Sequence, residues 1–163
     1  MRRIHSLAAA AMLLLGLLSP VARADLEVGQ TADRPGIELI DGSMLDTGHH
    51  DGKVVVALFW ATWCPICMSE LPEYQKLYQA YKARGLEIIA VSLDREPGVV
   101  SEYWRRSGYT FPAAMRTDAI RQAYGGIKGT PTLYLLDRRG VLRYKHLGGL
   151  PYEELEKQVK ALL

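Results

Sequence analysis

Residues 53–60, KVVVALFW, form a nearly unbroken run of β-branched and apolar side chains. Such a run is typical of a central strand that is buried on both faces. Apolar side chains at helical spacing follow from Pro65 to about Arg84, and Gly85 then favours a helix end. A buried strand, a short turn and a helix therefore follow one another, which indicates an α/β fold with helices packed on a sheet.

Other stretches have the patterns of further strands and helices. We expect a small hairpin over 37–46, a second buried strand over 86–94, helices over 97–107 and 118–124, an extended piece over 109–115, a late hairpin over 130–137 and 141–148, and an amphipathic helix over 151–163 with Pro151 in its first turn. The early strand-helix-strand unit requires a parallel crossover, whereas the late hairpin adds antiparallel strands. The chain thus predicts a mixed central sheet with helices on both faces.

Residues 1–24 have the composition of a secretory signal peptide. Two arginines open the chain, an uncharged and mostly apolar run follows over 7–18, and a pattern of small residues typical of a cleavage site ends at Ala24. As a helix this run would span only about 18 Å, whereas the hydrocarbon core of a bilayer is roughly 30 Å thick. We therefore predict a cleaved leader over 1–24 and one domain over 25–163, with an uncleaved membrane anchor as the alternative.

The charge of the chain gives no indication of a nucleic-acid partner. The net charge of the whole chain is +2, but residues 1–24 hold three basic and no acidic residues, so residues 25–163 carry a net charge of −1. The basic character thus belongs to the leader, and we expect no binding to nucleic acid.

The chain has two cysteines, Cys64 and Cys67. A bridge between them closes a loop of about four residues and would stabilise the fold little, because the entropic gain grows with loop length. A zinc site needs three or four ligands, and outside the leader only His49, His50 and His146 could add to the thiols. We expect the first two in a solvated turn and His146 on a strand, at the surface or packed. Copper or zinc on the two thiolates stays an alternative.

The position of the cysteines favours redox chemistry. Cys64 follows the strand and opens the helix, where the partial positive charge and free N–H groups of a helix N-terminus stabilise a thiolate. Pro65 at the first helical position loses no hydrogen bond. Cys67 is one helical turn away, close enough to attack a mixed disulfide formed at Cys64. A strand, a turn and a Cys-X-X-Cys motif at a helix start therefore indicate thiol-disulfide exchange.

Two prolines and a glutamate near these elements are further candidates. Glu70 lies three residues after Cys67, on the same side of the helix, and its carboxylate could exchange a proton with that thiol. The alternative is an exposed glutamate that the helix dipole favours. Pro72 is expected to kink the helix. Pro131 directly precedes a buried strand, where proline is tolerated, and the pattern alone does not distinguish a cis from a trans bond.

These motifs together resemble the thioredoxin family. The resemblance rests on WCPIC at 63–67 after an apolar strand, on Pro72 in the helix and on Thr130-Pro131 before a late strand. The exported TlpA-like branch, which includes the ResA and CcmG reductants of cytochrome c maturation, is the more similar. It shares the acidic residue before Leu-Pro in the helix and an insert around 95–124. The resemblance covers nearly all of 37–163.

The resemblance implies a thioredoxin-like fold and a role for each site residue. Cys64 would be the exposed nucleophile and Cys67 the buried resolving thiol. Pro131 would be cis and would pack against the disulfide, and the backbone of Thr130 would pair with a bound substrate strand. Glu70 matches the acidic residue that these proteins place near the active site.

The resemblance also assigns the surroundings of the cysteines. Trp60 and Trp63 would frame the site, and Pro65 and Ile66 would meet the substrate, with a Pro-X order that matches CcmG. Leu58 is a departure, because cytosolic thioredoxins have a buried Asp there and many TlpA-like proteins an Asn. Proton transfer at the buried thiol would then rest on the nearby carboxylate or on water.

We therefore predict an exported, periplasmic and monomeric thiol-disulfide oxidoreductase that needs no metal or other cofactor. It would reduce protein disulfides, such as those of an apocytochrome c or a copper-site assembly protein, with electrons from a membrane thiol carrier. A metallochaperone that holds copper or zinc on the two thiolates is one alternative. A disulfide oxidant resembling DsbA is the other.

Overall fold

The computed structural model describes residues 25–163, so the predicted leader lies outside the described residues. The main sheet consists of β3 (Val54–Trp60), β4 (Leu86–Ser92), β5 (Ala113–Met115), β6 (Thr132–Leu136) and β7 (Leu142–Leu147). Its strand order is β5-β4-β3-β6-β7. The pairs β3–β4 and β4–β5 are parallel, whereas β6 is antiparallel to both β3 and β7. The predicted mixed sheet is confirmed.

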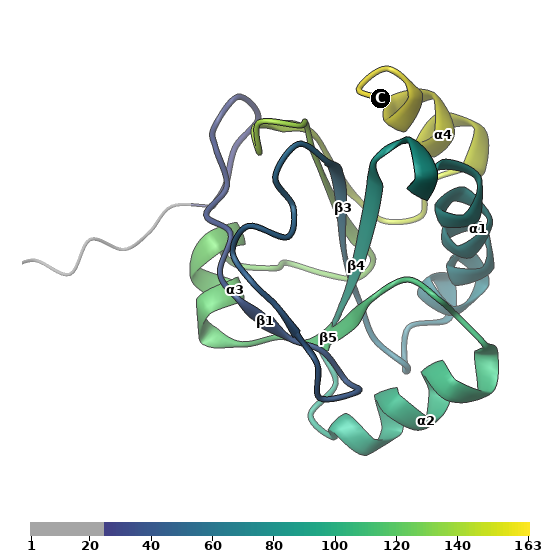
Figure 1. Ribbon diagram of the computed structural model, residues 1–163. Coiled ribbons are helices and arrows are strands. Elements are labelled where there is room, and N and C mark those ends of the chain that lie inside the picture. The colour runs from purple at the N-terminus through teal and green to yellow at the C-terminus, as the bar shows by residue number, and fades with distance from the viewer. Residues whose placement is uncertain (1–24) are drawn as a thin grey trace, which may run out of the picture.

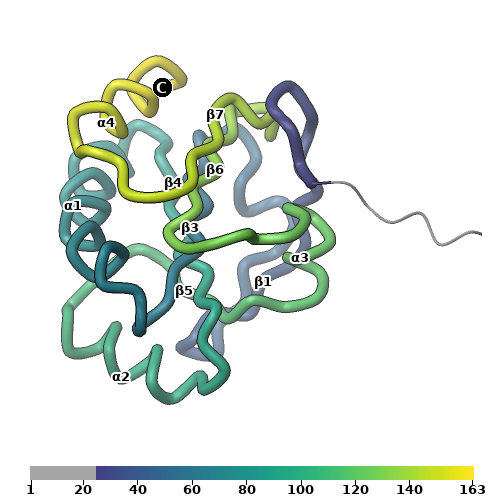
Figure 2. Tube along the Cα trace, turned by 180° about the vertical axis from the view of Figure 1, so that it is seen from behind, coloured from purple at the N-terminus to yellow at the C-terminus, as the bar shows by residue number. Residues whose placement is uncertain are grey.

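The helices cover both faces of this sheet (Figure 1). They are α1 (Pro65–Tyr81), the short 3₁₀-helix η1 (Lys82–Arg84), α2 (Pro97–Ser107), α3 (Asp118–Tyr124) and α4 (Tyr152–Lys160). Seen from either side, α1 and α4 lie together on one face, and α3 lies on the other (Figure 2). The insert expected around 95–124 forms α2, β5 and α3. Among the described residues no helix is long and apolar enough to cross a membrane.

Strand β3 is the centre of two hydrophobic cores. Its even-numbered residues pack into the core that includes side chains of α1, α2 and α4. Its odd-numbered residues pack into the core that includes side chains of α3. Side chains on a strand alternate between the two faces of a sheet, so every position of β3 is buried. This two-sided burial explains the unbroken apolar run in the sequence.

Helix α1 begins at Pro65 and continues past Pro72 to Tyr81. The last turn before Gly85 is η1, and Gly85 has a left-handed backbone with φ 97°. The predicted end of the helical segment is thus confirmed, although its final turn is 3₁₀ rather than α. The expected kink at Pro72 stays a prediction.

The remaining differences concern element ends. The small hairpin is confirmed as β1 (Ile37–Glu38) and β2 (Met44–Leu45), two antiparallel strands shorter than the pattern predicted. Pro151 was expected in the first turn of the last helix, but it is the residue that precedes α4. Its ψ of 142° is extended, so the helix begins one residue later.

Candidate active site

Three loops meet at one end of the central strands because of the strand register. Phe59, near the end of β3, pairs with Thr132 at the start of β6, and Thr132 pairs with Leu147 at the end of β7. The same end of the sheet therefore holds the segment after β3, the segment before β6 and the segment after β7. The backbone N–H of Gly148 accordingly donates to the carbonyl oxygen of Pro131 at 2.8 Å.

Cys64 and Cys67 form a disulfide, with their Cα atoms 5.3 Å apart. Cys64 is the N-cap residue of α1, and its sulfur accepts a hydrogen bond from the backbone N–H of Cys67 at 3.2 Å. Pro65 is the first residue of the helix. The sulfur of Cys64 therefore lies at the positive end of the helix, where a thiolate is stabilised.

The disulfide lies just below an apolar surface. Cys67 is 1% exposed, as expected for the buried thiol, but Cys64 is only 5% exposed, so the expectation of an exposed Cys64 is wrong for the disulfide form. The residues beside it are open to solvent, with Trp63 65% and Ile66 51% exposed. Pro65 between them is exposed as well. We call Trp63, Pro65 and Ile66 the apolar rim. These three residues form an exposed surface next to Cys64 in the chain, and their contact with a substrate stays a prediction.

Trp60 does not belong to this surface, and the expectation that it would frame the site is wrong. Its side chain is fully buried, and its ring packs against Tyr103 and Trp104, with ring centroids 5.6 and 5.3 Å away. The alternation of β3 is the reason, because it directs this last residue of the strand into the core beneath the helices.

The bond between Thr130 and Pro131 is cis, as the family resemblance implied. Pro131 is buried and Thr130 is half-buried. The packing of Pro131 against the disulfide and the pairing of Thr130 with a substrate strand stay predictions.

Glu70 is half-buried and is held by the loop between β7 and α4. Its Oε1 accepts a hydrogen bond from the backbone N–H of Leu150 at 2.6 Å, and its Oε2 is buried without a partner among the described residues. Burial raises the pKa of Glu70, while the Leu150 N–H and the charge of His146 lower it to a smaller extent. A carboxyl group with a raised pKa is better matched to proton exchange near neutral pH.

Leu58 is 1% exposed and belongs to the same core as Cys67. Position 58 therefore contributes an apolar side chain to the core that also contains Cys67, where the related proteins have a carboxylate or an amide.

Asp94 supports the turn that leads to Cys64, a contact that the sequence analysis missed. Its carboxylate accepts hydrogen bonds from the backbone N–H of Thr62 at 2.9 Å, the hydroxyl of Thr62 at 2.6 Å and the hydroxyl of Ser92 at 2.6 Å. Burial raises the pKa of Asp94, but these hydrogen bonds outweigh it and the pKa is lowered. The parallel pairing of β3 and β4 was the available signal, since it brings the two strand ends together.

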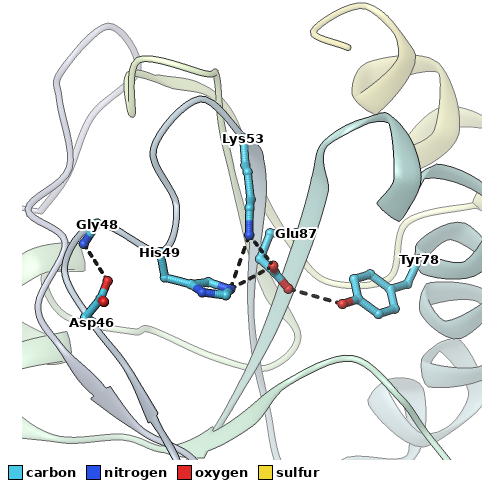
Figure 3. A network of polar contacts seen from close by, with 6 residues as sticks. All are labelled: Asp46, Gly48, His49, Lys53, Tyr78 and Glu87. Carbon is cyan, nitrogen blue, oxygen red and sulfur yellow. Dashed lines mark hydrogen bonds and ion pairs between the residues drawn. The ribbon is translucent and has the colours of Figure 1, made fainter.

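His49 and His50 were expected in a solvated turn, and this is wrong for His50. His50 is 5% exposed, and burial lowers its pKa to about 4. His49 is half-buried and lies 3.0 Å from Glu87, a buried carboxylate that Lys53 also contacts at 3.2 Å (Figure 3). A buried carboxylate needs such partners. Lys53 precedes β3 whereas Cys64 follows it, so this network lies at the opposite end of the strand from the cysteines.

His146 lies on β7 and is half-buried. Its Nε2 lies 3.0 Å from the carbonyl oxygen of Gly149. Within residues 25–163 no group of three or more His, Cys, Asp or Glu side chains is placed to hold a metal ion.

The model of the Redoxin family matches residues 27–163. The chain belongs to the Redoxin family. Among its relatives, the thiol-disulfide oxidoreductase ResA of Geobacillus kaustophilus is 32% identical over 136 residues, which cover 83% of this chain and 78% of that protein. ResA of Halalkalibacterium halodurans is also 32% identical, with coverage of 83% and 77%.

Solved structures agree with this Redoxin assignment. A thiol:disulfide interchange protein of the thioredoxin family from Chlorobium tepidum superposes with a TM-score of 0.78 at 26% identity, covering 85% of this chain and 99% of that one. StoA from Bacillus subtilis gives a TM-score of 0.64 at 25% identity, covering 75% and 92%. This Redoxin protein is thus a thiol-disulfide oxidoreductase with a thioredoxin-like fold, of the group that includes ResA and CcmG.

Proposed function

We propose that this Redoxin protein is an extracytoplasmic protein-disulfide reductase that works through Cys64 and Cys67. The observation that carries the proposal is the position of Cys64 as the N-cap residue of α1, next to the apolar rim. Its sulfur accepts a hydrogen bond from the backbone N–H of Cys67. A sulfur in this position is stabilised as a thiolate and lies beside a surface that a protein substrate can cover.

The reaction starts from the reduced protein. The Cys64 thiolate attacks one sulfur of a substrate disulfide, forms a mixed disulfide and releases the other substrate sulfur as a thiolate. Cys67 then loses its proton, attacks Cys64 and releases the second substrate thiolate. The substrate gains two electrons, and the protein is left with the disulfide between Cys64 and Cys67. A thiol carrier returns two electrons and closes the cycle.

Glu70 is proposed as the group that takes the proton from Cys67. It lies one helical turn further along α1, and its half-buried carboxyl has a raised pKa. Leu58 offers no carboxylate or amide for this purpose. The apolar rim and the backbone of Thr130 would bind the substrate on either side of Cys64, next to the cis Pro131.

The direction, the location and the partners belong to the same proposal. Ile66 brings no charge or hydrogen-bond donor to a Cys64 thiolate, which favours a reductant over an oxidant.

The leader composition of residues 1–24 supports export to the periplasm, with or without retention as an anchor. The substrate would then be an exported protein such as an apocytochrome c or a copper-site assembly protein. The protein would act as a monomer, with a membrane thiol carrier as donor.

Two cysteine variants test the assigned roles. Cys64→Ser should abolish the reduction of a model protein disulfide, because no nucleophile remains. Cys67→Ser should accumulate the mixed disulfide, because the resolving step is missing. In the reduced wild-type protein, Cys64 should be alkylated faster than Cys67, and faster alkylation of Cys67 would reverse the roles.

Trapping in the native cell tests the substrate and the location. The Cys67→Ala variant should be recovered in mixed disulfides with exported proteins, and mass spectrometry identifies them. Cys64→Ala/Cys67→Ala is the control and should trap nothing. Recovery with cytoplasmic proteins alone would contradict the proposed location. Stoichiometric copper or zinc on the reduced, anaerobically purified protein, without trapped substrates, would favour the metallochaperone.

A further inference from the structure

Residues 148–150, which we call the strap, lie in the connection that runs from the end of β7 to α4 (Figure 2). Each residue of the strap makes a polar contact through its backbone. The N–H of Gly148 donates to the carbonyl oxygen of Pro131 at 2.8 Å, and the N–H of Leu150 donates to Glu70 at 2.6 Å. Between them, the carbonyl oxygen of Gly149 lies 3.0 Å from the ring Nε2 of His146. The strap thus connects the cis-proline segment with the carboxylate on α1.

The middle of the strap lies against two residues of α1. A Cβ atom placed on Gly149 would be 2.9 Å from Oε1 of Glu70 and 3.2 Å from Cγ2 of Ile66. The first distance is shorter than real Cβ contacts, so any larger residue would displace the carboxylate or the strap. Glycine at 149 therefore permits the close approach on which the Leu150–Glu70 hydrogen bond depends.

The strap and the strand before it also supply the groups that act on Glu70. Leu150 provides a hydrogen-bond partner for its carboxylate, and the charge of His146 acts on it as well. Tyr74, on the same helix as Glu70, is a further ionisable side chain that interacts with it. Burial and the charge of Glu70 both raise the pKa of the Tyr74 hydroxyl, so Tyr74 stays neutral and does not compensate that charge.

We propose that the strap, held by His146, is the positioning element for Glu70: it fixes the carboxyl group for proton exchange at Cys67 and ties it to the segment around Pro131. This inference rests on the role proposed above for Glu70. His146 and Gly149 are positioning residues, because they act on Glu70 and not on the reacting sulfurs.

Gly149→Ala tests the close approach. The added methyl group must displace the Glu70 carboxylate or the strap, and either shift disturbs the Leu150–Glu70 contact. We expect the rate of protein-disulfide reduction to fall by roughly tenfold, since misplacement of a catalytic group by about 1 Å can lower a rate up to a hundredfold. Gly98→Ala on α2 is the matched control, because a Cβ there meets nothing within 4 Å. It should keep the wild-type rate. Equal rates for Gly149→Ala and the wild type would overturn the proposal.

A double variant distinguishes positioning of Glu70 from a general structural effect. If the strap acts through Glu70, Gly149→Ala should lower the rate little further in a protein that already carries Glu70→Gln. The same loss in both backgrounds, with native stability, would show that Gly149 acts by another route and would contradict the proposal.

His146 is tested by a measurement that needs no catalysis. Titration of the Glu70 side-chain carbon by NMR in the oxidised protein should show a higher pKa in His146→Leu than in the wild type, because the charge that lowers it is lost. His146→Gln should restore most of the reductase rate lost in His146→Leu, because an amide can still donate to the Gly149 carbonyl. An unchanged Glu70 titration in His146→Leu would overturn the assignment of His146.

These readouts separate the two proposals. An active Cys64→Ser variant would refute the proposed function, but the NMR titration would still report whether the strap holds Glu70. A Glu70→Gln variant with an unchanged pH-rate profile would refute the role of Glu70 in proton transfer, and the positioning role of the strap would fall with it.

Discussion

Glu70 combines partial burial with a carboxylate oxygen that lacks a partner among the described residues. Because burial raises its pKa, the folded protein holds the proton of Glu70 more tightly than the unfolded chain does. Its contribution to stability is therefore fully present below the ordinary pKa of 4.5 and is lost as the pH rises through the raised pKa. The ionised form at neutral pH is the less favourable one for the fold.

We therefore expect Glu70→Gln to gain stability relative to the wild type between pH 4 and pH 8, since glutamine cannot ionise. Urea unfolding of the oxidised proteins at both pH values measures the difference. Glu38→Gln, an exposed site in the hairpin, is the control. A stability difference between Glu70→Gln and wild type that is the same at both pH values would speak against the raised pKa. The pH-rate profile between pH 5 and 9 should change in the same variant.

The pKa of His50 is shifted in the opposite direction to that of Glu70. Its pKa is lowered from 6.5 to about 4, mainly by burial, so the unfolded chain binds the proton more readily between these values. Stability should consequently fall as the pH drops from 6.5 towards 4, at no more than about 1.4 kcal/mol per pH unit for one group. His50→Leu should flatten this part of the stability curve, which thermal unfolding across the range measures. An equally steep decline in the variant would show that His50 is not the cause.

Side chains whose role follows from local sequence could be predicted, and those with distant partners could not. Cys64 and Cys67 were recognisable from a strand, a turn and a helix start. The burial of Trp60 depends on Trp104, and the ion pair of His49 depends on Glu87; both partners lie far away in the chain and give no local pattern.

The same distinction holds between elements. Periodicity and turn residues predicted nearly every helix and strand, because two-sided burial of β3 and the apolar face of α1 leave clear patterns. The hydrogen bonds that join loops have no such pattern. Thr62 and Asp94 are 32 residues apart, and Glu70 and Leu150 are 80 apart, so only the folded sheet brings them together.

The contact between the ends of β3 and β4 leads to a prediction. Asp94→Ala removes three hydrogen bonds to a carboxylate. One hydrogen bond to a charged group contributes about 1.5–3 kcal/mol to stability, and the contributions of bonds to the same group do not simply add. We expect a loss of about 2–4 kcal/mol at pH 7, measured by urea unfolding. Asp118→Ala, at an exposed aspartate of α3, should lose less than about 1 kcal/mol.

The pH dependence checks the cause of this loss. Asp94 has a lowered pKa in the folded protein, so its stabilisation is present above the ordinary value of 3.8 and is lost as the pH falls through the lowered pKa. The difference between Asp94→Ala and wild type should therefore shrink in acid. A difference that persists unchanged at pH 2 would mean that lost packing, not the charged hydrogen bonds, destabilises the variant.

In the molecule as a whole, one edge of the mixed sheet collects the parts of the proposed site. Cys64 follows β3, Pro131 precedes β6 and the strap follows β7. The fold fixes the two cysteines relative to one another and to the rim, but it would do so equally in a reductant and in an oxidant. The charges and hydrogen bonds near the Cys64 sulfur decide the direction.

The redox potential tests the assignment as a reductant most directly. The potentials of thioredoxin and DsbA are about −270 and −120 mV, and this gap corresponds to about 7 kcal/mol. Ile66 adds no positive charge near the Cys64 thiolate, and an ionised Glu70 disfavours further negative charge on the cysteines, so both features stabilise the disulfide relative to the thiolates. Equilibration with glutathione should give a potential nearer to that of thioredoxin, and the oxidised protein should melt at a higher temperature than the reduced one. A potential above about −180 mV, with the reduced form melting higher, would identify an oxidant or isomerase and contradict the proposed reductase.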